Sequence, residues 1–267
     1  MRVPTVMAVA GTDPTGGAGL AADIKTIHAL GGYALPVVSA VVAQNGWDML
    51  GCVVTEPALL LAQMEAVAKV MAVDMVKIGL LGSAAAMRAM ASWLQATGRP
   101  AVLDPVMAAS AGHIFAGDEQ QAVLRGPLAA AVTLITPNLA EAGRLLNTAQ
   151  ATSLAGMVAQ AQALARVTPW VLLKGGHFPE QGVPHLETPD VLAGPGGVVQ
   201  LYRGARINTP HGRGTGCTLS SAVALYCAQG CPMPVAVAKA RHHVRASLRR
   251  AADLGLVAER GPLQPFA

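Results

Sequence analysis

The sequence predicts an α/β protein in which a mostly parallel central sheet lies between two layers of helices. Short runs that are apolar throughout alternate along the chain with alanine-rich segments of helical length. Strands without polar alternation are typical of a sheet that is buried on both faces. Hydrophobic residues make up 52% of the chain and charged residues 13%, which is enough apolar material for such a core. We therefore expect a three-layer αβα fold.

The expected elements follow in order along the chain. Strands are predicted over 5–10, 36–42, 74–80, 101–103, 132–135 and 170–173, and helices over 20–30, 56–72, 84–96, 139–146 and 154–165. Proline and glycine become dense over 175–204, where the runs 191–192 and 198–202 predict antiparallel edge strands. Two helices, over about 216–229 and 234–252, close the chain. No linker or repeat divides it, so we expect one domain over residues 1–267.

Composition excludes several classes of protein. The net charge is +4, but aromatic residues are only 3% and no basic stripe carries interleaved aromatics, so no nucleic-acid partner is expected. No uninterrupted apolar stretch reaches the length of a membrane span, and no signal peptide opens the chain. Four cysteines without a CxxC pair indicate reduced thiols in a cytoplasmic protein. The densest basic cluster falls at helical spacing and is expected to be a solvated helix face: Arg241, His242, His243, Arg245, Arg249 and Arg250.

A glycine-rich loop, residues 11–19, follows the first expected strand. It resembles two kinds of phosphate-binding loop and matches neither, because Gly17 and Ala18 stand where a Walker A loop needs lysine and serine or threonine. A dinucleotide fingerprint would need an acidic residue about 20 positions further on, and none is there. The glycines are expected to let the backbone approach a small flat substrate, with Asp23 in the first turn of the next helix. A tight strand-to-helix turn is the alternative.

Polar side chains also follow other expected strands. Gln44 presents both a donor and an acceptor, which suits the edge of an aminopyrimidine. Asp104 and Glu141 are suited to Mg2+, which takes one or two carboxylates together with phosphate oxygens. For Glu141 a favourable charge in the first turn of a helix is an equal alternative. Lys174, with Gly175 beside it, could contact a nucleotide phosphate.

The most informative loop is Gly212–Thr218, which leads into an apolar helix. Its glycines predict an anion hole formed by the backbone amides of Gly214, Thr215 and Gly216, with the helix dipole behind them. Cys217 would stand in the first helical turn with a lowered pKa. It could be a nucleophile, a base or a passive lining residue. A covalent mechanism needs a partner base, and no sequence feature selects one of the seven histidines.

Taken together, these loops resemble the hydroxymethylpyrimidine/phosphomethylpyrimidine kinases of thiamin biosynthesis, within the ribokinase-like superfamily. The resemblance covers about residues 5–250. It rests on AGTDPTGGAGLAADIKT (10–26), VVAQN (41–45), VKIGLLGS (76–83), VLDPVM (102–107), ITPNLAEA (135–142), LLKGGH (172–177) and GTGCTLSSA (214–222). It implies phosphorylation of 4-amino-5-hydroxymethyl-2-methylpyrimidine and of its monophosphate with ATP and Mg2+. A homodimer is also implied.

The resemblance also implies roles for individual residues. Gln44 would pair with the pyrimidine, with Gly11, Asp23, Leu80 and Met107 nearby. Asn138 and Glu141 match an N-x-x-E motif that organises Mg2+ and phosphate. Lys174, Gly175 and Thr215 would border ATP. Cys217 occupies the position at which other ribokinase-like enzymes carry an aspartate base.

The chain departs from the family pattern at three places. Arg213 stands where histidine is common before Gly-Thr-Gly-Cys, and Gly46 stands where threonine is usual. After the Asp-Pro-Val-Met motif, Ala111-Gly112-His113 replaces the usual Ser-Gly-Asp. These changes bear on the efficiency of the second phosphorylation, that of the monophosphate.

Three other functions compete with this interpretation. A pyridoxine or pyridoxal kinase would bind a ring of similar size in the same place. An NAD-dependent oxidoreductase would need the missing ribose-binding acid. A non-catalytic small-molecule-binding regulator would leave the anion hole and the pair of Asn138 and Glu141 without a purpose.

Overall fold

The computed structural model describes residues 2–107, 117–176, 187–257 and 259–267. These residues form a nine-stranded sheet with the order β3-β2-β1-β4-β5-β6-β7-β8-β9. The strands are β1 (Thr5–Gly11), β2 (Tyr33–Gln44), β3 (Met49–Val54), β4 (Met75–Ile78), β5 (Ala101–Leu103), β6 (Leu134–Ile135), β7 (Trp170–Lys174), β8 (Asp190–Ala193) and β9 (Val199–Tyr202). Neighbouring strands from β2 to β7 are parallel, whereas β3, β8 and β9 pair antiparallel. The predicted fold class is confirmed.

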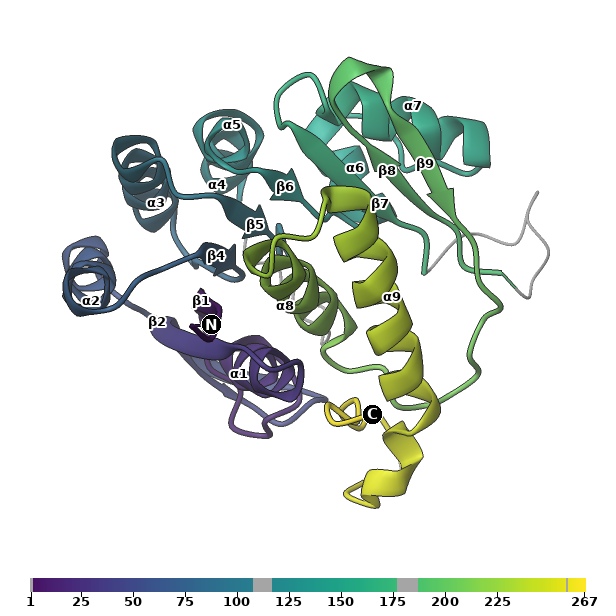
Figure 1. The fold of residues 1–267 in the computed structure, drawn as a ribbon, viewed down its shortest axis with the longest axis horizontal. Coiled ribbons are helices and arrows are strands. Elements are labelled where there is room, and N and C mark those ends of the chain that lie inside the picture. The colour runs from purple at the N-terminus through teal and green to yellow at the C-terminus, as the bar shows by residue number, and fades with distance from the viewer. Residues whose placement is uncertain (1, 108–116, 177–186, 258) are drawn as a thin grey trace.

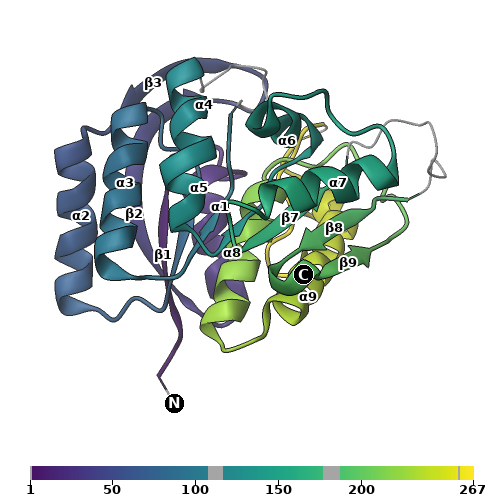
Figure 2. The ribbon, with the colours of Figure 1, turned by 90° about the horizontal axis from the view of Figure 1, so that it is seen from above.

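Helices cover both faces of this sheet (Figures 1 and 2). One layer contains α1 (Gly19–Ala29), α8 (Thr215–Ala228) and α9 (Met233–Arg249). The opposite layer contains α2 (Pro57–Val70), α3 (Ala84–Thr97), α4 (Asp118–Val123), α5 (Ala129–Ala131), α6 (Leu139–Leu146) and α7 (Leu154–Leu164). Short turns of 3-10 helix lie at Pro195–Gly197 and Ala251–Leu254. Every residue of β1 is buried, as the all-apolar pattern predicted.

The edge strand β3 was not predicted from the sequence. Its residues are half-buried or exposed and include Gly51, so the segment lacks the apolar run that marks a central strand. It forms because the chain turns back after β2 and pairs with it. The turn is at Asn45, whose side-chain oxygen accepts hydrogen bonds from the amides of Trp47 and Asp48. Gly46 supplies the positive φ of 95° that this turn needs.

A second unpredicted region precedes β6. The short helices α4 and α5 are joined there by a π-helical turn (Leu124–Leu128) that contains Pro127. Proline inside a helix removes a backbone hydrogen-bond donor. The sequence of this segment therefore lacks the pattern that predicts one regular helix. Among the described residues, no helix combines the length and the apolar character needed to cross a membrane.

Candidate active site

A cavity of about 900 Å³ opens at the carboxyl ends of the parallel strands. Its lining comes from the loops that follow β1, β4, β5, β6 and β7 and from the N-terminus of α8. In open α/β sheets this edge is the usual location of a ligand site. Of the predicted site residues, it brings together Gly11, Gln44, Leu80, Asp104, Met107, Asn138, Glu141, Lys174, Gly214, Thr215, Gly216 and Cys217.

The loop before α8 brings two glycines to the start of that helix, at the wall of the cavity. Gly214 caps the helix with a φ of 83°, and a Cβ there would collide with the carbonyl oxygen of Gly17. The next glycine, Gly216, lies against an ion pair, since a Cβ there would be 2.9 Å from Oδ2 of Asp104 and 3.4 Å from Nζ of Lys174. Gly214 therefore has to be glycine, Gly216 leaves room for the ion pair, and the N-terminus of α8 lies at a cavity that also holds charged groups.

Asp104 and Lys174 form this ion pair at 2.9 Å between Oδ1 and Nζ. Both side chains are largely buried. Burial acts to lower the pKa of Lys174, but Asp104 and Glu141 outweigh it and the pKa is raised, so this lysine stays charged. A buried, permanently charged ammonium at a helix N-terminus is suited to contact with phosphate oxygens.

Glu141 caps a helix and also lines the cavity, so its position is compatible with both alternatives considered from the sequence. Its carboxylate accepts a hydrogen bond from the backbone amide of Asn138 at 2.7 Å, and Asn138 caps the first turn of α6 in return. Both residues also line the cavity. Burial raises the pKa of Glu141, and with the opposing effect of Lys174 and the added repulsion from the Asp104 carboxylate the pKa is about 7. Two mutually repelling carboxylates at one cavity would gain from a divalent cation between them.

These carboxylates fit Mg2+ that is held mainly by phosphate oxygens. Within the described part of the chain, no cluster of three or more His, Cys, Asp and Glu side chains forms a complete metal site. Mg2+ needs no such cluster, because it keeps several waters and takes one or two carboxylates together with substrate phosphates. Asp104 and Glu141 would supply those carboxylates.

The expectation of a lowered pKa for Cys217 is wrong. The thiol lies at the start of α8, where Gly19 at the start of α1 and the nearby ammonium of Lys77 both favour the thiolate. Burial dominates these effects, and the carboxylates of Asp23 and Asp104 add to it, so the pKa is raised to about 11. A thiol that keeps its proton at neutral pH is a weak nucleophile and a weak base, so this pKa favours the role of a lining residue over the other two.

This pKa predicts how Cys217 reacts with iodoacetamide. The alkylation rate should keep rising about tenfold per pH unit from about pH 7 to about pH 10, because the rate follows the small thiolate fraction. Mass spectrometry of the peptide that carries Cys217 gives the rate, and the urea-unfolded chain is the control. A rate in the folded protein that levels off by about pH 8 would show that the thiolate is stabilised after all.

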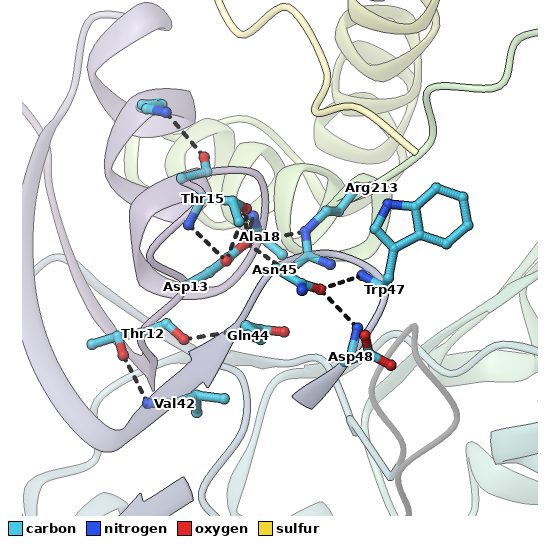
Figure 3. Close-up of polar contacts among 12 residues, drawn as sticks. Thr12, Asp13, Thr15, Ala18, Val42, Gln44, Asn45, Trp47, Asp48 and Arg213 are labelled. Atoms are coloured by element: carbon cyan, nitrogen blue, oxygen red, sulfur yellow. Dashed lines mark hydrogen bonds and ion pairs between the residues drawn. The ribbon is translucent and has the colours of Figure 1, made fainter. Parts of the chain in front are cut away.

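Gln44 also lines the cavity, and it lies beside Thr12 of the glycine loop (Figure 3). Its Nε2 donates to the carbonyl oxygen of Thr12 at 3.3 Å, which orients the side chain and leaves Oε1 as an acceptor. The hydroxyl of Thr12 in turn accepts a hydrogen bond from the amide of Val42. Gly11 lies against Leu80, because a Cβ there would be 3.2 Å from Cδ2 of that leucine. This arrangement would hold a flat ring between backbone and apolar side chains.

Asp23 does not line the cavity, which corrects the expectation of substrate contact. It lies in the second turn of α1, with no exposed surface. Its carboxylate pairs with Lys77 at 2.8 Å and accepts a hydrogen bond from the hydroxyl of Ser221 at 2.8 Å. Lys77 itself does line the cavity. The role of Asp23 is therefore to hold this lysine in place at the cavity.

The basic cluster near the C-terminus is not only a solvated face, which corrects that expectation in part. Arg241 and Arg245 line the cavity. Arg241 pairs with Asp190 at 2.6 Å, and Arg245 donates to the carbonyl oxygen of Ala205. His243 is buried on the inner side of the same helix. Because a helix presents neighbouring residues to different surroundings, a charge run at helical spacing does not reveal which members face a ligand.

The remaining residues of the sequence analysis have different outcomes. Gly175 packs against the carbonyl oxygen of Pro189 and donates its amide to Asp190, so it supports the cavity wall without lining it. The departure at Ala111-Gly112-His113 and the final histidine of LLKGGH, His177, lie outside the described residues. The sequence analysis named Lys77 only as part of the motif over 76–83. A lysine inside an apolar strand run could have been singled out, because a buried lysine requires a partner.

Comparisons with known proteins agree with this geometry. A family model described as phosphomethylpyrimidine kinase matches residues 13–264. The hydroxymethylpyrimidine/phosphomethylpyrimidine kinase of Rhizobium meliloti is 37% identical over 261 residues, which cover 97% of this chain and 96% of that protein. The protein of the same name from Salmonella typhimurium is also 37% identical, over 100% of this chain and 98% of its own. The chain spans about a third (35%) of the multifunctional thiamine biosynthesis protein of Corynebacterium efficiens, at 38% identity.

Solved structures show the same fold. The ADP complex of Bacillus subtilis pyridoxal kinase has a TM-score of 0.88 at 26% identity and covers 100% of this chain and 98% of its own. Phosphomethylpyrimidine kinase from Clostridium difficile has a TM-score of 0.79 at 28% identity and covers 92% of this chain and 100% of its own. With a family model over nearly its whole length and relatives of matching length, the chain belongs to the phosphomethylpyrimidine kinase family.

Proposed function

We propose that this protein transfers the γ-phosphoryl group of ATP to the hydroxymethyl group of 4-amino-5-hydroxymethyl-2-methylpyrimidine, and then to the resulting monophosphate, in thiamin biosynthesis. The observation that carries the proposal is one cavity that joins an amide-edged pocket at Gln44 to the anion hole at Gly214–Gly216. The names of the full-length relatives support the substrate. The ADP complex of the related pyridoxal kinase supports the use of an adenine nucleotide.

The chemistry needs little beyond positioning and charge. Phosphoryl transfer passes through a loose transition state, so the attacking hydroxyl gains little from a strong base. This agrees with a protonated Cys217. The backbone amides of α8 and the ammonium of Lys174 would stabilise the negative charge on the transferred group. When bound, Mg2+ would add further positive charge, held at Asp104 and Glu141.

Product analysis tests the proposed function. Purified protein is incubated with Mg-ATP and the pyrimidine alcohol, and mass spectrometry follows the monophosphate, the diphosphate and ADP. Both phosphorylated products should appear in sequence. Consumption of ATP with no phosphorylated pyrimidine would contradict the proposal.

Gln44→Ala should weaken binding of the pyrimidine about 5- to 150-fold and leave ATP affinity unchanged. The amino group of the ring would lose its acceptor inside a closed pocket, at a cost of about 1 to 3 kcal/mol. Calorimetric titration with each ligand separately measures both affinities. Equal losses for the pyrimidine and for ATP would place the ring elsewhere. Gln63→Ala is the control, since that glutamine bonds Val38 and does not line the cavity.

A pyridoxal kinase activity is the second candidate. The pyridoxal kinase of Bacillus subtilis resembles this chain over its full length at 26% identity. Its substrate ring is similar in size to the pyrimidine, so kcat/KM measured with both alcohols distinguishes the two functions. A higher value with pyridoxal would favour the second candidate.

A homodimer in the cytoplasm completes the proposal. The support for association is the edge of the sheet, where Leu50 and Val53 on the edge strand β3 and Val41 on the neighbouring β2 are exposed. Apolar side chains on an edge strand favour a partner surface. Light scattering of the purified protein measures the oligomeric state.

A further inference from the structure

Arg213 lies buried at the junction of two loops of the site (Figure 3). Its Nε and Nη2 both donate to Oδ2 of Asp13, at 3.2 and 2.9 Å. The side chain of Arg213 is 6% exposed and that of Asp13 is fully buried. The pair connects the glycine loop after β1 to the anion-hole loop before α8, across 200 residues of sequence.

Asp13 is held firmly by its own loop. Its two oxygens accept hydrogen bonds from the amides of Thr15 and Ala18 and from the hydroxyl of Thr15, at distances of 2.8 to 3.1 Å. These donors share the negative charge of the carboxylate, so it is not satisfied by the guanidinium alone. Arg213 is thereby fixed in one orientation before any ligand binds, and little side-chain entropy remains to be lost.

One donor group of Arg213 is not used by this pair. Nη1 has no hydrogen-bond acceptor among the described residues, although the side chain is more than nine-tenths buried. It lies beside Gly46, where a Cβ would be only 3.3 Å away, and both residues line the cavity. A guanidinium NH2 group at the cavity that has no protein acceptor is free to donate to a ligand or to water.

The position of Arg213 is next to the anion hole. Gly214 follows it directly. Gly214 lies against the glycine loop after β1, because a Cβ on Gly214 would collide with the carbonyl oxygen of Gly17. The Cδ of Arg213 also lies 3.2 Å from the Cβ position of Gly17. A group bound at the α8 amides would therefore have this guanidinium at its side.

We propose that Arg213 is a specificity-determining residue for the phosphorylated substrate, whose phosphate it would bind through Nη1. The inference rests on the proposed function and deepens it. In the second reaction a phosphate oxygen of the monoester attacks the γ-phosphorus, a new P–O bond forms, the bond to the β-phosphate bridging oxygen breaks, and ADP leaves with that electron pair. The attacking oxygen is already deprotonated, so the step needs a cation to offset repulsion between two phosphates, and no base.

The two lysines that line the cavity are already paired within the protein. Lys77 is bonded to Asp23 and Lys174 to Asp104, each at 2.8 to 2.9 Å. Arg213 is likewise paired with a carboxylate, that of Asp13, but it keeps a whole NH2 group for a ligand. Guanidinium also matches the geometry of phosphate oxygens better than an ammonium or an imidazole does.

The test compares the two substrates in Arg213→Gln. Steady-state kinetics should show that KM for the pyrimidine monophosphate rises about 10- to 100-fold, the effect of one charge-assisted hydrogen bond, while KM for the alcohol stays within about threefold. Calorimetry with the monophosphate alone should show the same loss without turnover. Arg213→Lys, which keeps the charge, should retain part of the affinity.

Controls separate this role from a structural one. Arg88→Gln removes an exposed charge far from the cavity and should change neither KM. Should Arg213→Gln fail to fold, the double variant Asp13→Asn/Arg213→Gln takes its place, because it removes both charges and keeps a pair of amide side chains. The KM values for the alcohol and for the monophosphate are then compared in the double variant. Equal changes in both KM values, or none, would overturn the role of Arg213 while leaving the kinase function intact. Wild-type protein that phosphorylates neither pyrimidine would instead refute the proposed function.

Discussion

Gly216→Ala is expected to lower kcat by about 10²- to 10³-fold, the loss typical of one displaced oxyanion donor. The new methyl group would lie 2.9 Å from Oδ2 of Asp104 and 3.4 Å from Nζ of Lys174. Neither atom can withdraw easily, because the two groups are bonded to each other at 2.9 Å in a largely buried place. The methyl would therefore displace the ion pair, the first turn of α8 or both.

Steady-state assays of ADP formation at saturating concentrations of both substrates measure this change in kcat. Circular dichroism should show a retained fold, because alanine is favoured in a helix over glycine. Gly126→Ala is the control, since a Cβ there has no neighbour within 4 Å and that glycine does not line the cavity. Unchanged kcat in Gly216→Ala would show that the amides of α8 do not contact the transferred group.

Lys77→Met is expected to lower the free energy of unfolding by about 3 to 5 kcal/mol, the cost of leaving one member of a buried ion pair alone. Lys77 and Asp23 both have fully buried side chains, and their contact of 2.8 Å joins β4 to α1. Burial raises the pKa of Asp23, so the carboxylate without its lysine would take up a proton instead of remaining charged. Urea unfolding followed by circular dichroism gives the change.

The double variant Lys77→Met/Asp23→Leu separates the charge effect from the packing effect. It should recover most of the lost stability, because replacing a whole buried pair by apolar side chains is often neutral. Arg88→Met, which breaks an exposed pair with Glu119, should cost no more than about 1 kcal/mol. A loss in Lys77→Met as small as that of the surface variant would contradict the buried pair.

The fold could be predicted because its main signals are local. Uniform apolar runs such as 101–103 mark strands buried on both faces, and the structure has β5 at those residues. The strand β3 could not be predicted, since its residues are held by pairing with β2 and not by their own pattern. Likewise, glycines ahead of an apolar helix predicted a glycine-capped α8, and Gly214 provides that cap.

Electrostatic roles depended on burial, which a sequence does not state. Cys217 was expected to have a lowered pKa from its place at a helix N-terminus, but the low dielectric around it outweighs the helix and the lysine. Asp23 was placed against the substrate, whereas the turn of α1 directs it into the core toward Lys77. In both cases the sequence placed the residue on the correct helix but did not show which groups surround its side chain.

The sequence by itself determined the αβα architecture, the loops that carry the site and the family, because periodicity and motif spacing are properties of the chain. Only the tertiary structure decided which charged groups meet. Asp13 and Arg213 are 200 residues apart and become partners because the loops after β1 and before α8 converge at one edge of the sheet. Pair energies and pKa values follow distance and burial in space, and these are fixed only when the chain has folded.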